Sequence, residues 1–190
     1  MRIGLLGGSF DPPHIGHLLA AGDAFEALNL DRLIFVPAAV QPLKVNQVTA
    51  TAAQRCAMVK LLVEGDPRFE VSSSEIDRGG LSYTVDTLLT FSAEWPAAEL
   101  FWLVGVDVLR TFAKWRAPER IVQLATIVVL SRSGETPDLS EMPGTPRVLD
   151  TRRIDVSSTE IRQRVREGKS IRGFMPDAVA SFIAAERLYR

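Results

Sequence analysis

The chain has few of the features that mark several large classes of protein. Its single cysteine, Cys56, excludes an internal disulfide and gives no zinc cluster. No apolar run approaches the roughly 20 residues that a membrane-spanning helix needs, and the N-terminus enters a predicted strand without a signal-peptide pattern. A formal net charge of −1 argues against a protein that coats nucleic acid. We therefore expect a cytoplasmic protein with no membrane and no nucleic-acid partner, whose oligomeric state is open.

Short apolar segments alternate with amphipathic segments along the 190 residues. Strands are predicted at 3–6, 32–36, 69–72, 100–104, 127–130 and 147–149. Helices are predicted at about 16–28, 52–64, 84–94 and 117–124, with two more in the C-terminal segment 155–190. This alternation predicts an α/β fold with a doubly wound, mostly parallel, Rossmann-like sheet, forming one domain over 1–190. Ligands of such sheets bind beyond the carboxyl ends of the strands, where the strand order reverses.

The segment 7–17, Gly-Gly-Ser-Phe-Asp-Pro-Pro-His-Ile-Gly-His, lies between the first predicted strand and the first predicted helix. Its glycines allow a ligand to approach the backbone, and a helix N-terminus presents free amides to an anion. His14 and His17, at positions i and i+3, should point their rings the same way, toward adjacent phosphates. The string resembles the HxGH signature of the nucleotidyltransferase superfamily. Class I aminoacyl-tRNA synthetases share the tetrapeptide, but this chain is too short for their anticodon-binding region.

A second candidate site begins at Ser157, where Ser158, Thr159 and Glu160 follow and Arg162 lies within about one turn. Ser157 and Glu160 are spaced as in a capping box, so a capped helix with an exposed arginine is one interpretation. Backbone amides, hydroxyls and a guanidinium also make a phosphate site. The segment resembles the ISSTxxR signature that accompanies HxGH, with Val156 in place of the isoleucine.

The segment 81–88, Leu-Ser-Tyr-Thr-Val-Asp-Thr-Leu, leads from a glycine turn into a helix that Ser82 or Thr84 could cap. It resembles the SYTxDTL element of bacterial nicotinate mononucleotide adenylyltransferases. In that family the backbone of the tyrosine and threonine recognises the pyridine carboxylate. The resemblance implies this role for Tyr83 and Thr84.

Gly105, Asp107 and Trp115 follow the fourth predicted strand. An acidic side chain at that strand end can accept ribose hydroxyls, and a tryptophan can stack on a flat ring. The three resemble the GxDxL…W element of the same family, which implies pyridine stacking for Trp115. The family commonly has Pro-His-Lys after the second strand, with the lysine near the substrate phosphates. Here Leu43 replaces the histidine, and only Lys44 carries the resemblance.

The resemblance, which covers residues 7–162, implies transfer of the adenylyl group of ATP to nicotinate mononucleotide in NAD synthesis. The acceptor phosphate is already ionised, so no protein nucleophile is needed, and catalysis rests on positioning and charge neutralisation. Mg²⁺ should arrive with ATP, because the sequence shows no carboxylate cluster and hence no protein metal site. The implied catalytic residues are His14, His17 and Arg162. The implied ATP-binding residues are Gly8, Ser9, Phe10, His14, His17, Gly105, Asp107, Ser157, Ser158, Thr159 and Arg162, and those for nicotinate mononucleotide are Ser9, Lys44, Tyr83, Thr84, Asp107 and Trp115.

Three other functions share part of this pattern. A phosphopantetheine adenylyltransferase should lack SYTxDTL and the GxDxL…W pair. A cytidylyltransferase would differ in a nucleotide pocket that sequence describes poorly. A nucleotide-binding regulator without turnover would bind ATP and form no product. The loops 37–50 and 131–146 are rich in Pro, Gly, Ser, Thr and charge, and no chemistry is assigned to the second.

Overall fold

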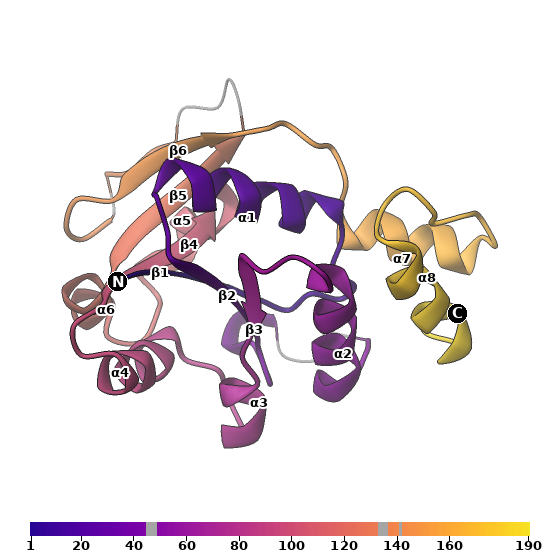
Figure 1. The fold of residues 1–190 in the computed structure, drawn as a ribbon, viewed down its shortest axis with the longest axis horizontal. Coiled ribbons are helices and arrows are strands. Elements are labelled where there is room, and N and C mark those ends of the chain that lie inside the picture. The colour runs from indigo at the N-terminus through magenta and orange to yellow at the C-terminus, as the bar shows by residue number, and fades with distance from the viewer. Residues whose placement is uncertain (45–48, 133–136, 141) are drawn as a thin grey trace.

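A six-stranded parallel sheet forms the centre of the described chain, residues 1–44, 49–132, 137–140 and 142–190 of the computed structural model (Figure 1). The strand order is β3-β2-β1-β4-β5-β6, and every neighbouring pair is parallel. The strands are β1 (Arg2–Gly8), β2 (Arg32–Pro37), β3 (Phe69–Val71), β4 (Glu99–Gly105), β5 (Thr126–Arg132) and β6 (Arg147–Thr151). The chain winds outward from β1 to β3 and then returns to β4 on the other side of β1, so the strand order reverses between β1 and β4.

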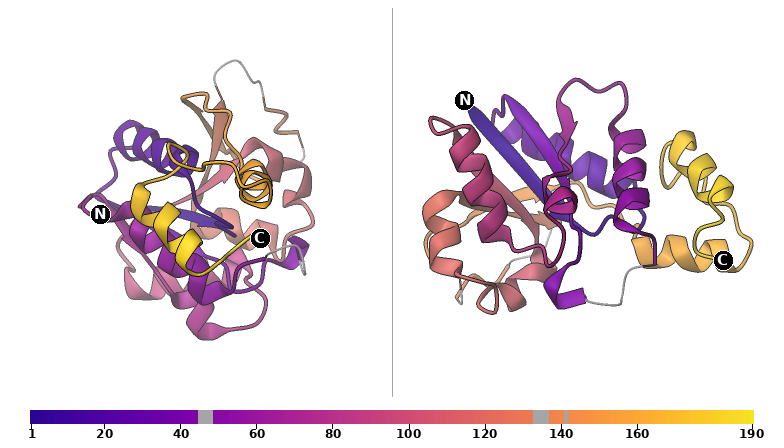
Figure 2. Two further views of the ribbon diagram at one scale, coloured as in Figure 1. Left: turned by 90° about the vertical axis from the view of Figure 1, so that its right-hand side faces the viewer. Right: turned by 90° about the horizontal axis from the view of Figure 1, so that it is seen from below.

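Helices cover both faces of the sheet (Figures 1 and 2). They are α1 (Ile15–Ala27), η1 (Pro42–Lys44), α2 (Ala52–Val63), α3 (Ser74–Arg78), α4 (Thr84–Glu94), η2 (Val106–Val108), α5 (Leu109–Phe112), α6 (Pro118–Leu124), α7 (Ser158–Arg166) and α8 (Asp177–Ala185). The Thr51 hydroxyl accepts the Gln54 N–H at the start of α2, and the Ser157 hydroxyl accepts the Glu160 N–H at the start of α7. Both contacts satisfy an amide that has no partner inside its helix.

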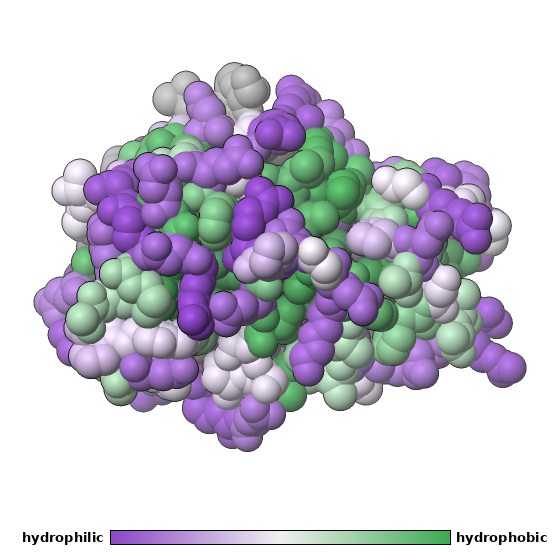
Figure 3. All heavy atoms as spheres, in the orientation of Figure 1, coloured by the Kyte–Doolittle hydropathy of each residue, from purple (hydrophilic) through white to green (hydrophobic). Residues whose placement is uncertain are grey.

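The apolar core has two halves because alternate strand residues point to opposite faces. Leu6 and Phe35 pack with residues of α1, α2, α7 and α8, whereas Leu5 and Ile34 pack with residues of α4, α5 and α6. The central strands β1, β2 and β4 therefore read as near-continuous apolar runs, which is typical of a parallel sheet buried on both faces, whereas the edge strand β6 is largely exposed. On the face drawn in Figure 3, hydrophilic side chains are interrupted by a band of hydrophobic ones through the middle of the surface.

The predicted fold class, the six strands and the six predicted helices are confirmed. The last helix, α8, ends at Ala185, and beyond it Arg187 and Tyr189 adopt positive φ angles of 52° and 64°. Cys56 is buried in α2. Parts of the two polar loops, 45–48 and 133–136, lie outside the described residues. Within those described, no helix combines the length and apolar character that crossing a membrane requires.

Candidate active site

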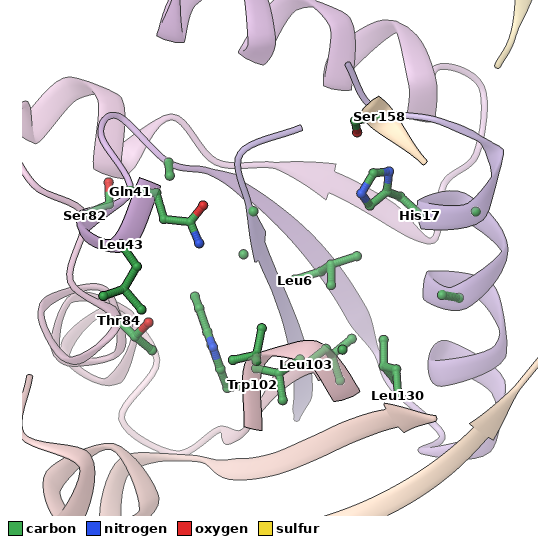
Figure 4. A pocket seen from close by; sticks show the side chains of 18 of the residues that line it. Leu6, His17, Gln41, Leu43, Ser82, Thr84, Trp102, Leu103, Leu130 and Ser158 are labelled. Atoms are coloured by element: carbon green, nitrogen blue, oxygen red, sulfur yellow. The ribbon is translucent and has the colours of Figure 1, made fainter. Parts of the chain in front are cut away.

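A cavity of about 430 Å³ opens at the carboxyl edge of the sheet, where the strand order reverses. Figure 4 shows His17 and Ser158 on one side of it and Gln41, Leu43 and Thr84 on the other. Trp102 and Leu103 of β4 lie at a third side. The cavity thus collects side chains from segments that are distant in sequence, as expected at this position in an α/β sheet.

The two histidines stand together at the start of α1 and both line the cavity. Their ring centroids are 3.8 Å apart and the rings are inclined by 35°, so they point the same way, as the spacing predicts. The His14 backbone N–H donates to Nδ1 of His17 at 3.2 Å. Phe10, whose φ is 51°, packs its ring edge-on to His17 with the centroids 5.1 Å apart. Phe10 is therefore a buried support for His17 and is not part of the lining.

The electrostatics of His17 favour a neutral ring. Exclusion of water lowers the pKa of His17 well below its ordinary value of 6.5, and the neighbouring His14 lowers it further. Because Nδ1 accepts a hydrogen bond, the proton of the neutral ring belongs on Nε2. His17 can therefore donate a hydrogen bond to a phosphate oxygen without carrying a charge.

The two signature segments meet directly, although about 150 residues separate them. Nη1 of Arg162 donates to the Asp11 carbonyl at 2.7 Å, and the Ser158 hydroxyl donates to the Pro12 carbonyl at 2.8 Å. Nη2 of Arg162 donates to Oγ1 of Thr159 at 3.1 Å. Ser157 and Ser158 line the cavity, whereas Thr159 and Arg162 lie outside the lining. The guanidinium of Arg162 thus holds the loop after β1 through the Asp11 carbonyl.

The N-terminus of α4 faces the cavity with Tyr83 as its N-cap residue, and no side chain caps it. The prediction that Ser82 or Thr84 caps this helix is wrong. Oγ of Ser82 accepts the Ala39 N–H at 2.9 Å instead, which ties α4 to the loop after β2. The Asp86 N–H donates to the Tyr83 carbonyl at 3.0 Å, whereas the Thr84 and Val85 amides precede the first bond of the helix, and amides in that position can bind an anion.

A buried carboxylate lies behind this helix terminus. Glu75, 4% exposed, borders the cavity and accepts a hydrogen bond from the Thr87 hydroxyl. Burial raises the pKa of Glu75, and its hydrogen bonds with Thr87 and Ser82 oppose that change. Glu75 therefore joins the turn before α4 to the body of that helix.

Trp115 presents a flat ring at the same end of the cavity. It is half-buried, and it stacks on Phe112 with the ring centroids 5.0 Å apart and the planes inclined by 29°. The Arg116 guanidinium carbon lies 4.9 Å from the centroid of the Tyr83 ring. The ring of Trp115 can therefore stack on a planar ligand beside the start of α4.

The remaining predicted residues divide by position. Gly8 and Gly105 line the cavity, whereas Asp107 is exposed on η2 outside the lining. Ser9 also lies outside it, and its hydroxyl donates to Oε1 of Gln41 at 2.6 Å. Lys44 ends η1, and its side chain lies outside the described part of the structure. Leu43, at the position of the family's histidine, is 47% exposed and lines the cavity.

Comparison with known proteins agrees with this geometry. The family model "Cytidylyltransferase-like" matches residues 5–164. A Gemmatimonas aurantiaca protein is 52% identical over the whole chain and 93% of its own length, and a Thermus thermophilus protein is 47% identical over the full length of both. Both are named "Probable nicotinate-nucleotide adenylyltransferase".

The chain belongs to the nicotinate-nucleotide adenylyltransferases of the cytidylyltransferase-like family. Its fold is shared with Plasmodium falciparum nicotinic acid mononucleotide adenylyltransferase complexed with NaAD. That similarity has a TM-score of 0.80 at 18% identity and covers 99% of this chain and 97% of the other.

Three residues at or near the cavity carry no motif: Trp102 and Glu75 line it, and Arg55 lies outside the lining. Trp102 belongs to an apolar strand, and Glu75 precedes the turn of the third motif. Arg55 had a signal that was overlooked. It lies on the same face of α2 as Val59 and Leu62, where a charged side chain among apolar ones needs buried partners.

Proposed function

We propose that this chain joins ATP to nicotinate mononucleotide, giving nicotinate adenine dinucleotide and pyrophosphate. The observation that carries the proposal is one cavity with a histidine pair and Ser158 on one side and the uncapped start of α4 with Trp115 on the other. The first side suits a polyphosphate, and the second suits a planar ring that bears a carboxylate. Full-length relatives that bear this activity in their names support the same assignment.

The reaction is an in-line displacement at the α-phosphorus of ATP. A 5′-phosphate oxygen of the mononucleotide forms the new P–O bond as the bond to the bridging oxygen of pyrophosphate breaks. The nucleophile is already ionised at neutral pH, so the chain supplies alignment and stabilisation of developing charge. His14 and His17 donate to phosphate oxygens, with His17 neutral. Ser157, Ser158 and the amides of the glycine turn complete the phosphate site.

Other residues have proposed roles in substrate recognition. The amides of Tyr83 and Thr84 bind the pyridine carboxylate, and Trp115 stacks on the pyridine ring. Asp107, which lies outside the cavity lining, is proposed to position ribose, and Gly105 is proposed to contact ATP. Arg162 and Thr159 are proposed to hold the β- and γ-phosphates. The guanidinium bonds the Asp11 carbonyl and Thr159 through two of its five N–H groups, so a phosphate contact would use the others.

Mg²⁺ is proposed to arrive on the triphosphate, where it would neutralise phosphate charge. Among the residues that the structure describes, no three His, Cys, Asp or Glu side chains cluster as a ligand set. The proposed ion would take its ligands from phosphate oxygens and water, as Mg²⁺ commonly does. The cytoplasmic location stays a prediction from the sequence.

Pyrophosphate release from ATP and Mg²⁺ tests the proposal, with nicotinate mononucleotide, nicotinamide mononucleotide and phosphopantetheine as separate acceptors. We expect release with nicotinate mononucleotide at least about tenfold faster than with the other two, a difference equal to about 1.4 kcal/mol in transition-state binding. Release only with another acceptor would overturn the roles of Tyr83, Thr84 and Trp115. ATP binding without release would instead favour a regulator.

A further inference from the structure

Arg55 of α2 is a buried arginine that binds three backbone carbonyls from separate segments of the chain. It is 2% exposed. Nη1 donates to the Ser9 carbonyl at 2.7 Å, Nη2 to the Ala39 carbonyl at 2.9 Å, and Nε to the Ala50 carbonyl at 3.3 Å. Only a planar guanidinium presents donors in a fork that can reach all three at once.

Two of these carbonyls belong to loops that form the cavity. Ser9 follows Gly8 in the loop after β1, and Ser9 also bonds Gln41 of the loop after β2. Ala39 lies in that second loop, and its N–H donates to Ser82, the residue before Tyr83. Arg55 thus links the loop of the phosphate side to the segment that leads into the α4 terminus.

The third carbonyl completes a closed arrangement around Asp11. The Ala50 N–H donates to Oδ1 of Asp11 at 3.1 Å, and the Thr49 N–H donates to Oδ2 at 2.8 Å. The Tyr189 hydroxyl donates to Oδ1 at 2.8 Å, which brings the C-terminal end of the chain to the same loop. Asp11 and Tyr189 are 4% and 3% exposed, so water competes little for these bonds.

We propose that Arg55 is a positioning residue for adenylyl transfer. It sets the separation of the loops after β1 and β2, and so the alignment of the two substrates, without lining the cavity itself. The inference rests on the proposed function. In-line displacement requires reacting atoms about 3–3.5 Å apart, and a misplacement of about 1 Å can lower the rate by about 10². Arg55 does not line the cavity, so its loss should disturb the alignment of the substrates more than their binding, and kcat should fall more than either KM rises.

Arg55→Lys and Arg55→Met test this by steady-state kinetics in both substrates. We expect kcat to fall by about tenfold or more in each variant, with both KM values within about threefold of wild type. Arg55→Lys should retain more activity than Arg55→Met, because an ammonium can still donate to one or two of the carbonyls. Met58→Ala is the matched control, since it truncates a buried side chain of the same helix and leaves the guanidinium in place. Below its melting temperature, that control should keep kcat within about twofold of wild type.

Amide hydrogen exchange provides a readout that needs no turnover. In Arg55→Met, residues 8–17 and 38–44 should exchange faster than in wild type, whereas Met58→Ala should leave both segments protected. If Arg55→Met fails to fold, Tyr189→Phe replaces it, because it removes one hydroxyl from Asp11 and keeps the ring. That variant should loosen residues 8–17 and lower kcat several-fold.

Two outcomes would overturn the inference: a kcat in Arg55→Met within about twofold of wild type, or unchanged exchange in both loops. Wild-type enzyme that turns over no acceptor would refute the proposed function instead, and the exchange comparison would still decide whether Arg55 holds the loops.

Discussion

Gly7 of β1 leaves no room for a side chain, and its replacement by alanine gives a direct test of the packing beneath the cavity. A Cβ at position 7 would lie 2.6 Å from Cζ2 and 2.7 Å from Cη2 of Trp102. Carbon atoms prefer separations of about 3.5–4.0 Å, so an overlap of about 1 Å must be relieved. Trp102 is 4% exposed on β4, which pairs with β1, so neither strand can withdraw freely.

Overpacking of this kind costs about 1–3 kcal/mol. A chain of this size loses about 2–4 °C of melting temperature per kcal/mol, so Gly7→Ala should melt roughly 2–12 °C lower than wild type. Urea denaturation should show a lower midpoint with an unchanged slope. Gly22→Ala is the control, because apart from the neighbouring residues and the surrounding backbone of α1 no described heavy atom lies within 4 Å of its added Cβ. Alanine there should stabilise by about 0.5–1 kcal/mol. A midpoint for Gly7→Ala at or above the wild-type value would refute the packing argument.

Four further predictions concern the cavity. His17→Ala should lower kcat by about 10²–10⁴ with folding intact, and initial rates showing a loss below about tenfold would remove His17 from the mechanism. Because the folded pKa of His17 lies below its unfolded value of 6.5, stability from this group is present above that pH and falls as pH drops. Urea denaturation at a series of pH values below 6.5 should therefore show that the free energy of unfolding falls less steeply with decreasing pH in His17→Gln than in wild type. Equal pH dependence in the two proteins would contradict the neutral ring. Trp115→Ala should raise KM for nicotinate mononucleotide far more than for ATP, whereas equal rises would mean that the ring only packs on Phe112. In thermal shift assays at equal concentration, nicotinate mononucleotide should raise the melting temperature more than nicotinamide mononucleotide, and equal shifts would contradict carboxylate binding at α4.

The sequence predicts the sheet well because its central strands β1, β2 and β4 are apolar runs bounded by turn residues. Since every strand in this order is parallel, the segments after β1 and β4 had to meet at one edge, which brings Gly8 and Gly105 to the same cavity. The short helices α3 and α5 escaped prediction, because five and four residues show no helical period.

Residues that act through distant partners could not be predicted. Arg55 obtains its role from carbonyls 46, 16 and 5 residues away in sequence, and no local pattern encodes that set. Arg162 shows the converse case. Its motif predicts that the guanidinium binds phosphate, but here the guanidinium donates to the Asp11 carbonyl. Both groups accept hydrogen bonds through oxygen, so the motif alone does not distinguish them.

The incorrect prediction for α4 explains how this site is organised. Serine and threonine before a helix usually cap it, as Thr51 and Ser157 do for α2 and α7. At α4 the serine is diverted to the Ala39 N–H, and Tyr83 takes the N-cap position without a side-chain bond. Loss of a cap costs a helix about 0.5–2 kcal/mol, so the chain carries that cost at one terminus that borders the cavity. A carboxylate bound there would satisfy the same amides from outside. Under the proposed function, the uncapped terminus is part of an anion site, and the sequence motif marks it through the Ser82 hydroxyl, which accepts from the loop after β2 and not from the helix.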